Sequence, residues 1–337
     1  MNAKKIAVIG NGSFATALVK VLTDNHQSII WWMRSVEAKE HIVLHHHNPH
    51  YLSQVYFHSK DILLSNDINE AIDQADIILL AVPSAFLIDV LQQINPIVAK
   101  TKIFVSAIKG IVPGHNVLIN EYLQSVFGTA GDCYCCITGP CHAEEIAAEK
   151  LSYLTFSSEN LDLANSIADL FATKYLRTIK SADVYGVQFA AILKNIYALG
   201  AGIAHGLDYG DNFLSVYNTN CFAEMKEFMT TIAEHRQQLN TPHHYITSAY
   251  LGDLLVTSYS LHSRNRRFGN MIGKGYSVNA AKLELNMVAE GYYAAKCIFE
   301  INETIHAHTP IINEIYDVLW KNKSAKHAFK NIEEVLE

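Results

Sequence analysis

The chain has 337 residues, of which 50% are hydrophobic and 18% are charged, and its formal net charge is −7 at pH 7. This composition provides enough apolar side chains for a sizeable core and excludes a disordered chain. The negative charge excludes general electrostatic attraction to nucleic acid or to an anionic membrane.

An apolar run over residues 6–9 leads into the six residues Gly10 to Ala15, which read Gly-Asn-Gly-Ser-Phe-Ala. This is G-x-G-x-x-A, a permitted form of the dinucleotide-binding fingerprint. Gly10 allows a sharp turn, and Gly12 lets a pyrophosphate approach the backbone. The helix expected over 13–25 points its N-terminal N–H groups and its positive dipole end toward a phosphate. An ordinary glycine-containing turn is the alternative interpretation.

Strands and helices are expected to alternate through the first half of the chain. Apolar runs predict further strands over 27–33, 75–82, 102–107, 133–138, 152–157 and 176–180, with helices over 67–74, 84–93 and 161–173. Such alternation predicts a doubly wound α/β sheet of the Rossmann type, and the segment 37–66 is the least regular part of it. From residue 182 onward the periodicity is helical. Because the length favours two domains, we expect a dinucleotide-binding domain over 1–183 and an all-α substrate-binding domain over 184–337.

The second strand ends at Arg34-Ser35. Enzymes that use NAD usually place an acidic residue here, where it bonds the ribose 2′-hydroxyl. A guanidinium and a hydroxyl instead suit a 2′-phosphate. The sequence therefore favours NADP(H) over NAD(H), and a surface arginine without a ligand is the alternative.

A long apolar stretch over 184–203 has Lys194 in its middle. Its polar residues argue against a membrane span, and a helix that is apolar nearly all round is typical of a protein core. Burying an ammonium group costs free energy, so Lys194 is expected to have a partner or a function. Proton exchange with a carbonyl or alcohol oxygen fits such a lysine. A lysine that extends along the helix to solvent is the alternative.

A polar cluster follows in the segment 251–269. Asp253 and Thr257 share a helix face at spacing i, i+4. Ser263, Arg264 and Asn265 offer a hydroxyl, a fork of N–H donors and an amide, which together suit a phosphate group. A solvated basic turn is the alternative interpretation.

The cysteine and histidine clusters do not predict a metal centre. Of six cysteines, four lie between Cys133 and Cys141, but C-x-C-C-x₄-C is no standard zinc spacing. Burial as small apolar side chains is favoured, with metal binding and redox reactivity as alternatives. The polar tract from His45 to His50 is expected to have only adventitious metal affinity. The start of the chain lacks the apolar segment of a signal peptide, which predicts a cytoplasmic protein.

Seven motifs occur in a fixed order: Gly-Asn-Gly-Ser-Phe-Ala-Thr-Ala-Leu at 10–18, Ile-Lys-Gly-Ile at 108–111, Thr-Gly-Pro at 138–140, Leu-Lys-Asn-Ile-Tyr-Ala-Leu-Gly-Ala-Gly-Ile at 193–203, Gly-Asp-Leu-Leu-Val-Thr at 252–257, Ser-Arg-Asn-Arg-Arg-Phe-Gly at 263–269 and Val-Ala-Glu-Gly at 288–291. Over nearly its whole length the chain closely resembles the bacterial NAD(P)-dependent glycerol-3-phosphate dehydrogenases. The resemblance implies reversible hydride transfer between NAD(P)H and dihydroxyacetone phosphate. The product, sn-glycerol 3-phosphate, would supply the glycerol backbone of phospholipids.

The resemblance also implies roles for the matching positions. Lys194 would be the catalytic acid/base. The substrate would be bound by Lys109, Gly139, Cys141, Lys194, Asp253, Ser263, Arg264 and Asn265. With Gly10 and Gly12 of the loop, the cofactor would be bound by Ser13, Phe14, Arg34, Lys109, Ala143, Arg264, Val288 and Glu290. Phe14, Ala15 and Cys141 depart from the usual family residues, and a thiol is a poor hydrogen-bond donor.

Two other functions stay open. One is a dehydrogenase of the 3-hydroxyacid or ketopantoate type, whose substrate carries a carboxylate in place of the phosphate. The other is a sensor that binds NADPH without turnover, although a sensor needs no proton donor. The expected partner is a small phosphorylated molecule, with no metal, no nucleic acid and no stable membrane insertion, while a homodimer stays open.

Overall fold

The computed structural model describes residues 4–58, 60, 62–236, 247–285 and 289–337. Contacts divide the chain into two compact units. The first unit holds residues 1–108 and 117–184, and the second holds 109–116 and 185–337. The sequence-based boundary assigned 109–116 to the first domain, whereas its contacts lie with the second unit.

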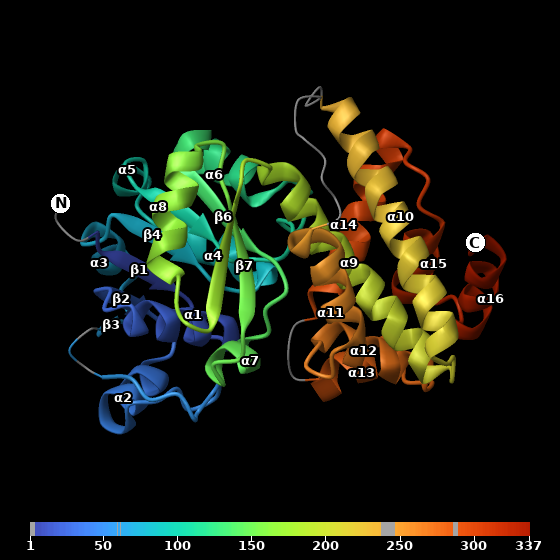
Figure 1. The fold of residues 1–337 in the computed structure, drawn as a ribbon, viewed down its shortest axis with the longest axis horizontal. Coiled ribbons are helices and arrows are strands. Elements are labelled where there is room, and N and C mark those ends of the chain that lie inside the picture. The colour runs from blue at the N-terminus through green and yellow to red at the C-terminus, as the bar shows by residue number, and fades with distance from the viewer. Residues whose placement is uncertain (1–3, 59, 61, 237–246, 286–288) are drawn as a thin grey trace. The chain divides into compact units, whose positions relative to one another are not determined.

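A single sheet forms the centre of the first unit (Figure 1). Its strands are β1 (Ile6–Ile9), β2 (Ile29–Trp32), β3 (Ile62–Ser65), β4 (Ile77–Leu80), β5 (Ile103–Ser106), β6 (Tyr134–Thr138), β7 (Ser152–Ser157) and β8 (Leu176–Ser181). They lie in the order β3-β2-β1-β4-β5-β6-β7-β8, and the neighbouring pairs are parallel except β6 and β7. From β1 the strand order proceeds to β2 and β3 on one side, and the chain then returns to β4 on the other side of β1. Doubly wound α/β proteins bind their ligands at such a switch point between β1 and β4.

Helices connect these strands. They are α1 (Ser13–Asp24), α2 (Val36–His45), α3 (Ile68–Asp73), α4 (Leu87–Leu91), α5 (Pro96–Ala99), α6 (Ile119–Phe127), α7 (Ala143–Ala147) and α8 (Leu161–Phe171). Helix α1 packs against α7 and α8, while α5 packs against α3 and α6. Alternate strand residues, such as Ile6 and Val8 of β1, share one core with α1, α7 and α8. The Rossmann-type α/β fold predicted from the sequence is thereby confirmed.

The irregular segment 37–66 contains two elements that its pattern did not reveal. Helix α2 buries only Ala38 and Ile42 and exposes Val43 and Leu44 to solvent, so it lacks an amphipathic period. Strand β3 lies at the edge of the sheet, and Leu63 within it is 49% exposed. Edge position weakens the alternation of apolar and polar residues on which strand prediction depends.

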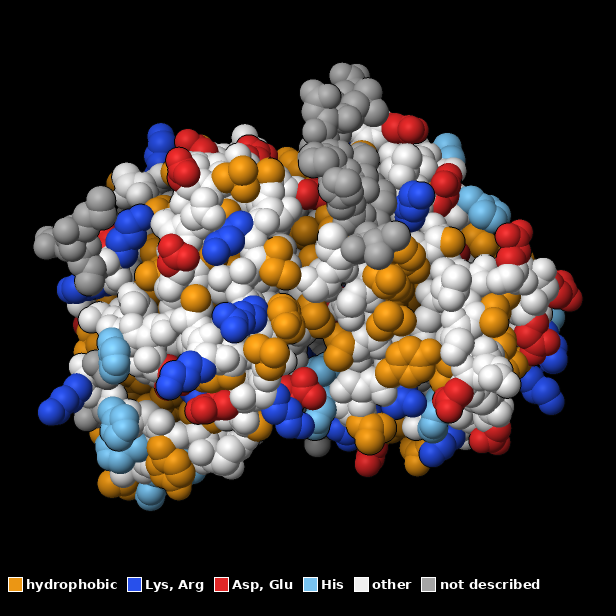
Figure 2. Space-filling view, viewed as in Figure 1, with side chains coloured by type: hydrophobic (Ala, Val, Ile, Leu, Met, Phe, Trp, Pro, Cys, Tyr) orange, Lys and Arg blue, Asp and Glu red, His pale blue; other side chains and the backbone are white. Residues whose placement is uncertain are grey.

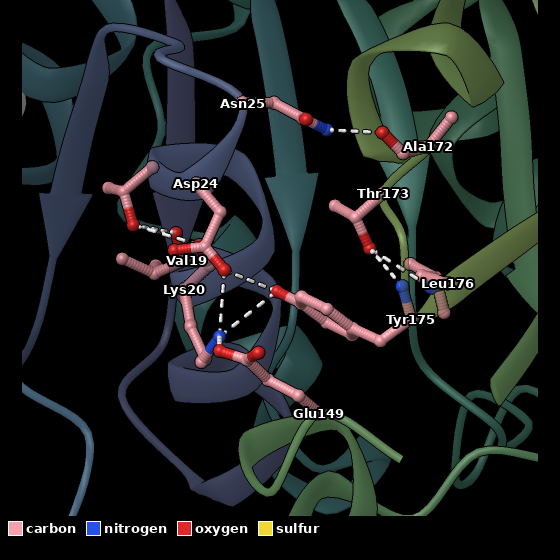
Figure 3. Close-up of polar contacts among 10 residues, drawn as sticks. Val19, Lys20, Asp24, Asn25, Glu149, Ala172, Thr173, Tyr175 and Leu176 are labelled. Carbon is pink, nitrogen blue, oxygen red and sulfur yellow. Dashed lines mark hydrogen bonds and ion pairs between the residues drawn. The ribbon is translucent and has the colours of Figure 1, made fainter. Parts of the chain in front are cut away.

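The C-terminal half of α1 is fixed by polar contacts (Figure 3). Lys20 Nζ donates to Asp24 at 2.7 Å, to Glu149 at 2.9 Å and to the Tyr175 hydroxyl at 3.1 Å. At the end of the helix, Asn25 Nδ2 donates to the carbonyl oxygens of Leu170, in the last turn of α8, and of Ala172, directly after that helix. Helix α1 is therefore tied to its neighbours at the end far from the glycine loop.

Apart from the segment 109–116 and the connecting loops, the described part of the second unit is helical. Its helices are α9 (Val184–Gly206), α10 (Asp211–His235), α11 (Asp253–Tyr259), α12 (Arg264–Gly273), α13 (Val278–Leu285), α14 (Glu290–Ile305), α15 (Pro310–Trp320) and α16 (Ala325–Val335), with a single π turn over Ser248–Gly252. Among the described residues, α9 alone is long and apolar enough to cross a membrane, but all of its most apolar stretch is buried inside the protein. It is the core helix that the sequence predicted.

Helices α9 and α12 cross at very short range. A Cβ placed on Gly269 of α12 would lie 1.9 Å from the carbonyl oxygen of Leu199, and one on Gly202 of α9 would lie 2.1 Å from that of Arg266. Only glycine permits this approach of one backbone to another. The crossing sets the distance between Lys194, earlier on α9, and the polar residues at the start of α12.

Candidate active site

The glycine loop joins β1 to α1 in the first unit. Gly10 has φ of 121°, a backbone conformation that residues other than glycine rarely adopt. A Cβ at this position would also lie only 2.7 Å from the carbonyl oxygen of Ala81, which follows β4. Gly12 is the N-cap of α1, and the place of its missing Cβ has no atom within 4 Å. Ser13 and the partly buried Phe14 begin the helix. The loop thus fits a pyrophosphate at the open side of Gly12.

Arg34 is exposed after β2, with its guanidinium 5.9 Å from the Phe86 ring. Ser35 follows as the N-cap of α2, and its hydroxyl accepts a hydrogen bond from Ala38 N at 3.0 Å. Since this serine starts a helix, the positive dipole end of α2 adds to the Arg34 charge at one place. Arg34 and the N-terminus of α2 therefore lie together directly after β2.

Gly139, Cys141 and Ala143 connect β6 to α7. Gly139 is buried with φ of 106°, and Cys141 Sγ donates a weak hydrogen bond to its carbonyl oxygen at 3.3 Å. Ala143 is the buried first residue of α7. The Cys141 thiol thus bonds its own loop in this structure.

Lys194 lies in the core of the second unit and is 4% exposed. Its ammonium group donates to Asp253 Oδ1 and, at 3.0 Å, to Thr257 Oγ1. Lys109 donates to the other carboxylate oxygen, Asp253 Oδ2, at 3.2 Å. The expected burial of Lys194 is confirmed, and a lysine that extends to solvent is excluded.

One carboxylate therefore holds two amines. Asp253 is 1% exposed, and burial by itself would disfavour its charged form. The charges of Lys109 and Lys194 and their hydrogen bonds outweigh burial, so the pKa of Asp253 lies below its ordinary value. Two of these three side chains are positively charged, and both contact the same carboxylate. Positively charged groups in a buried site are suited to bind an oxygen that gains negative charge during a reaction.

Two asparagines connect this cluster to its surroundings. Asn195 Nδ2 donates to the Lys109 carbonyl oxygen, and Asn265 Nδ2 donates to Asn195 Oδ1, both at 2.9 Å. Asn265 Oδ1 in turn accepts from Gly291 N at 2.9 Å. The sequence alone did not indicate a role for Asn195 or Thr257. The signal for Asn195 was its polar side chain beside Lys194 in an apolar helix, and the signal for Thr257 was its spacing from Asp253.

The remaining predicted residues lie at helix starts. Ser263 is the N-cap of α12, and its hydroxyl accepts from Arg266 N at 3.2 Å. Arg264 is the half-buried first residue of α12, and Glu290 is the first residue of α14. Val288 lies outside the described residues. Lys109, Lys194, Asp253 and Asn265 are thus joined by hydrogen bonds in one cluster, and the glycine loop residues form a separate group in the first unit.

The clustered cysteines and histidines lie outside the lysine–aspartate cluster. Burial raises the pKa of Cys135 to about 12, so this thiol is protonated at neutral pH and has the character of a small apolar side chain. Histidine side chains gather on the surface over α2 (Figure 2), where the rings of His41 and His45 are 4.4 Å apart. Within the described residues, no group of three or more possible ligands is arranged to hold a metal ion.

A Rossmann-type unit with a glycine loop, together with a helical unit that carries a buried lysine–aspartate cluster, defines a dinucleotide-dependent dehydrogenase. Two family models specify the class further. The N-terminal model of NAD-dependent glycerol-3-phosphate dehydrogenase matches residues 5–164, and the C-terminal model matches residues 183–330. The chain belongs to the NAD-dependent glycerol-3-phosphate dehydrogenase family and is an NAD(P)-dependent oxidoreductase.

Individual relatives agree with this assignment. The chain is 34% identical to a glycerol-3-phosphate dehydrogenase [NAD(P)+] of Bacillus velezensis, over 98% of this chain and 94% of the relative. It is also 34% identical to the enzyme of that name from Listeria innocua, over 97% and 95%.

Solved structures share the fold. The glycerol-3-phosphate dehydrogenase of Coxiella burnetii has a TM-score of 0.89 at 23% identity and covers 98% of this chain and 99% of its own. A ketopantoate reductase from Ralstonia eutropha reaches a TM-score of 0.58 at 15% identity, with 96% and 99% coverage. The fold of the ketopantoate-type alternative is therefore the more distant of the two.

Proposed function

We propose that this protein catalyses the reversible reduction of dihydroxyacetone phosphate to sn-glycerol 3-phosphate with NAD(P)H. The observation that carries the proposal is the buried Lys194 ammonium, which shares Asp253 with Lys109. Membership in the glycerol-3-phosphate dehydrogenase family supports the choice of substrate.

The chemistry of the reacting carbon requires a proton at the substrate oxygen. The dinucleotide supplies the hydride. Lys194 would donate a proton to the C2 oxygen as negative charge develops there, and would take it back in the reverse direction. Asp253 and Thr257 would hold the ammonium in position, and Lys109 would add positive charge for the developing alkoxide.

The phosphate of the substrate would be held by Ser263, Arg264 and Asn265 at the start of α12. A guanidinium, a hydroxyl and an amide can donate several hydrogen bonds to one phosphate group, and the N-terminus of a ten-residue helix adds its dipole. Fixing the phosphate would place the carbonyl carbon for hydride transfer. Gly139 and Cys141 are proposed at the same substrate, with Cys141 acting through its backbone because a thiol is a poor donor.

For the cofactor, we propose that Gly10, Gly12, Ser13 and Phe14 bind the pyrophosphate end, and that Arg34 binds the adenosine end. Lys109, Ala143, Arg264, Val288 and Glu290 would lie toward the nicotinamide. The exposed Arg34 at the N-terminus of α2 supports a preference for NADP(H). Arg34→Ala is expected to lower the ratio of kcat/KM for NADPH to that for NADH by at least about 10-fold, the effect of one charged hydrogen bond. An unchanged ratio would remove Arg34 from cofactor selection.

The physiological proposal follows from the reaction. A cytoplasmic enzyme of this kind would supply glycerol 3-phosphate for phospholipid synthesis without inserting into the membrane. The burial of α9 supports the absence of a membrane span in the described residues.

The test of catalysis is the loss of NAD(P)H absorbance in the presence of dihydroxyacetone phosphate. Lys194→Ala is expected to lower kcat by at least about 100-fold, as for a lost general acid, and to leave cofactor affinity within about 3-fold. Lys226→Ala is the matched control, because Lys226 is exposed on α10 in the same unit. Turnover by Lys194→Ala at the control's rate would refute the role of Lys194. Oxidation of NADPH with ketopantoate but not with dihydroxyacetone phosphate would refute dihydroxyacetone phosphate as the substrate.

A further inference from the structure

Three consecutive carbonyl groups of the glycine loop are each bound by a side chain. The Gly10 oxygen accepts from the indole N–H of Trp31 at 2.7 Å, and the Asn11 oxygen accepts from Asn48 Nδ2 at 2.9 Å. The Gly12 oxygen accepts from the Thr16 hydroxyl at 2.9 Å. Trp31 lies on β2, Asn48 follows α2, and Thr16 lies on α1, so three different segments converge on this loop.

Asn48 is fully buried, and every hydrogen-bonding position of its side chain is occupied. Its amide group donates to the Asn11 oxygen and to Thr16 Oγ1, both at 2.9 Å. Its carbonyl oxygen accepts from the backbone N–H of His50 at 3.0 Å and of Tyr51 at 3.2 Å. An asparagine can make four such bonds, and this one makes four. No similar-sized apolar residue, and no aspartate, could replace the donated pair.

Trp31 is equally well fixed. The side chain is fully buried, and its ring meets Phe57 edge to face with centroids 5.2 Å apart. Phe57 and Asn48 both belong to the connection between α2 and β3. This connection therefore supports the glycine loop twice, once through Asn48 directly and once through the packing of Phe57 on Trp31.

These bonds determine where the loop's N–H groups point. In a trans peptide the carbonyl of one residue and the N–H of the next point in opposite directions, and the described residues contain no cis peptide. Holding the Gly10 and Asn11 oxygens toward Trp31 and Asn48 turns the N–H groups of Asn11 and Gly12 the other way. A row of N–H groups with the carbonyls turned away is what binds an anion, since exposed carbonyl oxygens would repel it.

We propose that Trp31 and Asn48 are positioning residues for the dinucleotide pyrophosphate, which act by orienting the peptide groups of the glycine loop and do not touch the cofactor. The inference rests on the proposed function in assuming that the ligand is a dinucleotide. It adds two side chains, from outside the glycine motif, on which the affinity of that motif depends.

The test compares two asparagines at opposite ends of α1. Asn48→Leu removes the support of the loop, while Asn25→Leu removes two donated hydrogen bonds of the same kind at the far end of the helix. The measurements are the dissociation constant for NADPH and for NADH by titration calorimetry, the thermal unfolding midpoint, and kcat at saturating cofactor. Trp31→Phe is the milder second variant, since it keeps a buried ring and removes the indole N–H.

Asn48→Leu is expected to raise the dissociation constant of the better dinucleotide by at least about 10-fold and to leave kcat at saturating cofactor within about 3-fold. Trp31→Phe is expected to raise the dissociation constant by at least about 3-fold. Asn25→Leu is expected to lower the unfolding midpoint but to change the dissociation constant by less than about 2-fold.

Two results would overturn the inference alone: dinucleotide affinity within about 2-fold of wild type in both Asn48→Leu and Trp31→Phe, or an equal loss of affinity in Asn25→Leu. The second result would mean that general destabilisation is the cause. Failure of the wild-type chain to bind either dinucleotide would instead overturn the proposed function, and this inference with it.

Discussion

Replacement of Asp253 by asparagine removes the negative charge that both Lys109 and Lys194 contact. The change keeps the size of the side chain, so packing around it is preserved. The Lys109 ammonium lies 3.2 Å from this carboxylate, and Lys194 is closer and only 4% exposed. The variant therefore measures the electrostatic support of Lys194 with little contribution from cavity formation.

The expected loss can be bounded from both sides. Removing one partner of a buried ion pair costs about 3–5 kcal/mol. The uncompensated amine can also lose its proton, and for a lysine with an ordinary pKa near 10.4 this costs about 5 kcal/mol at pH 7 but only about 2 kcal/mol at pH 9. Since the folded variant binds the lysine proton less tightly than the unfolded chain does, raising the pH stabilises it. The free energy of unfolding of Asp253→Asn should therefore be lower than that of wild type by about 3 kcal/mol or more at pH 7, and by less than about 2 kcal/mol at pH 9.

Thermal unfolding of wild type and Asp253→Asn at the two pH values is the assay. Because the helical unit is of ordinary domain size, 1 kcal/mol corresponds to about 2–4 °C, so the midpoint should fall by about 6–12 °C at pH 7 and by half of that or less at pH 9. Asp211→Asn is the control, since Asp211 is exposed in the first turn of α10. Its deficit should be small and equal at both pH values. A deficit for Asp253→Asn that stays constant or grows at pH 9 would refute the reasoning.

Other variants probe a buried acid, a helix crossing and the proposed phosphate site. Burial raises the pKa of Glu224 to about 8 despite hydrogen bonds from Ile311 N and Ile312 N. Because the folded state then binds this proton more tightly than the unfolded chain does, the free energy of unfolding falls as the pH rises from about 5 to 8. Glu224→Gln should remove most of that fall in urea unfolding, and a slope like that of wild type would contradict the assignment. Gly269→Ala should cost more than about 3 kcal/mol or prevent folding, because its Cβ meets the Leu199 carbonyl; a loss below about 1 kcal/mol would show that the crossing is loose. Arg264→Ala should raise KM for dihydroxyacetone phosphate by at least about 10-fold and KM for NADPH less, and steady-state kinetics with an unchanged substrate KM would exclude a phosphate contact.

Local patterns in the sequence were sufficient to predict the glycine loop and the buried lysine. The glycine loop was recognisable because its turn, its strand and its helix are adjacent in the chain. Lys194 was identified as a buried amine because the residues around it are apolar on every side of a helix. Both signals come from neighbours within a few turns, which is the range over which periodicity reports burial.

Only the tertiary structure decided which groups meet. Lys109, Lys194 and Asp253 are separated by 59 to 144 positions in the chain, and no local pattern showed that Asp253 bonds both lysines. Helix packing brings them together, and no pattern within one helix encodes a partner on another.

The segment 37–66 shows the same limit. Its helix and edge strand are half exposed and carry weak periodicity, so the sequence did not reveal Asn48 as a support of the glycine loop. The sequence by itself determined the class of fold and the charged and polar residues that are candidates for catalysis and binding. Their pairing was decided by the packed structure, because a buried hydrogen bond depends on distance and direction in space and leaves no period in the chain.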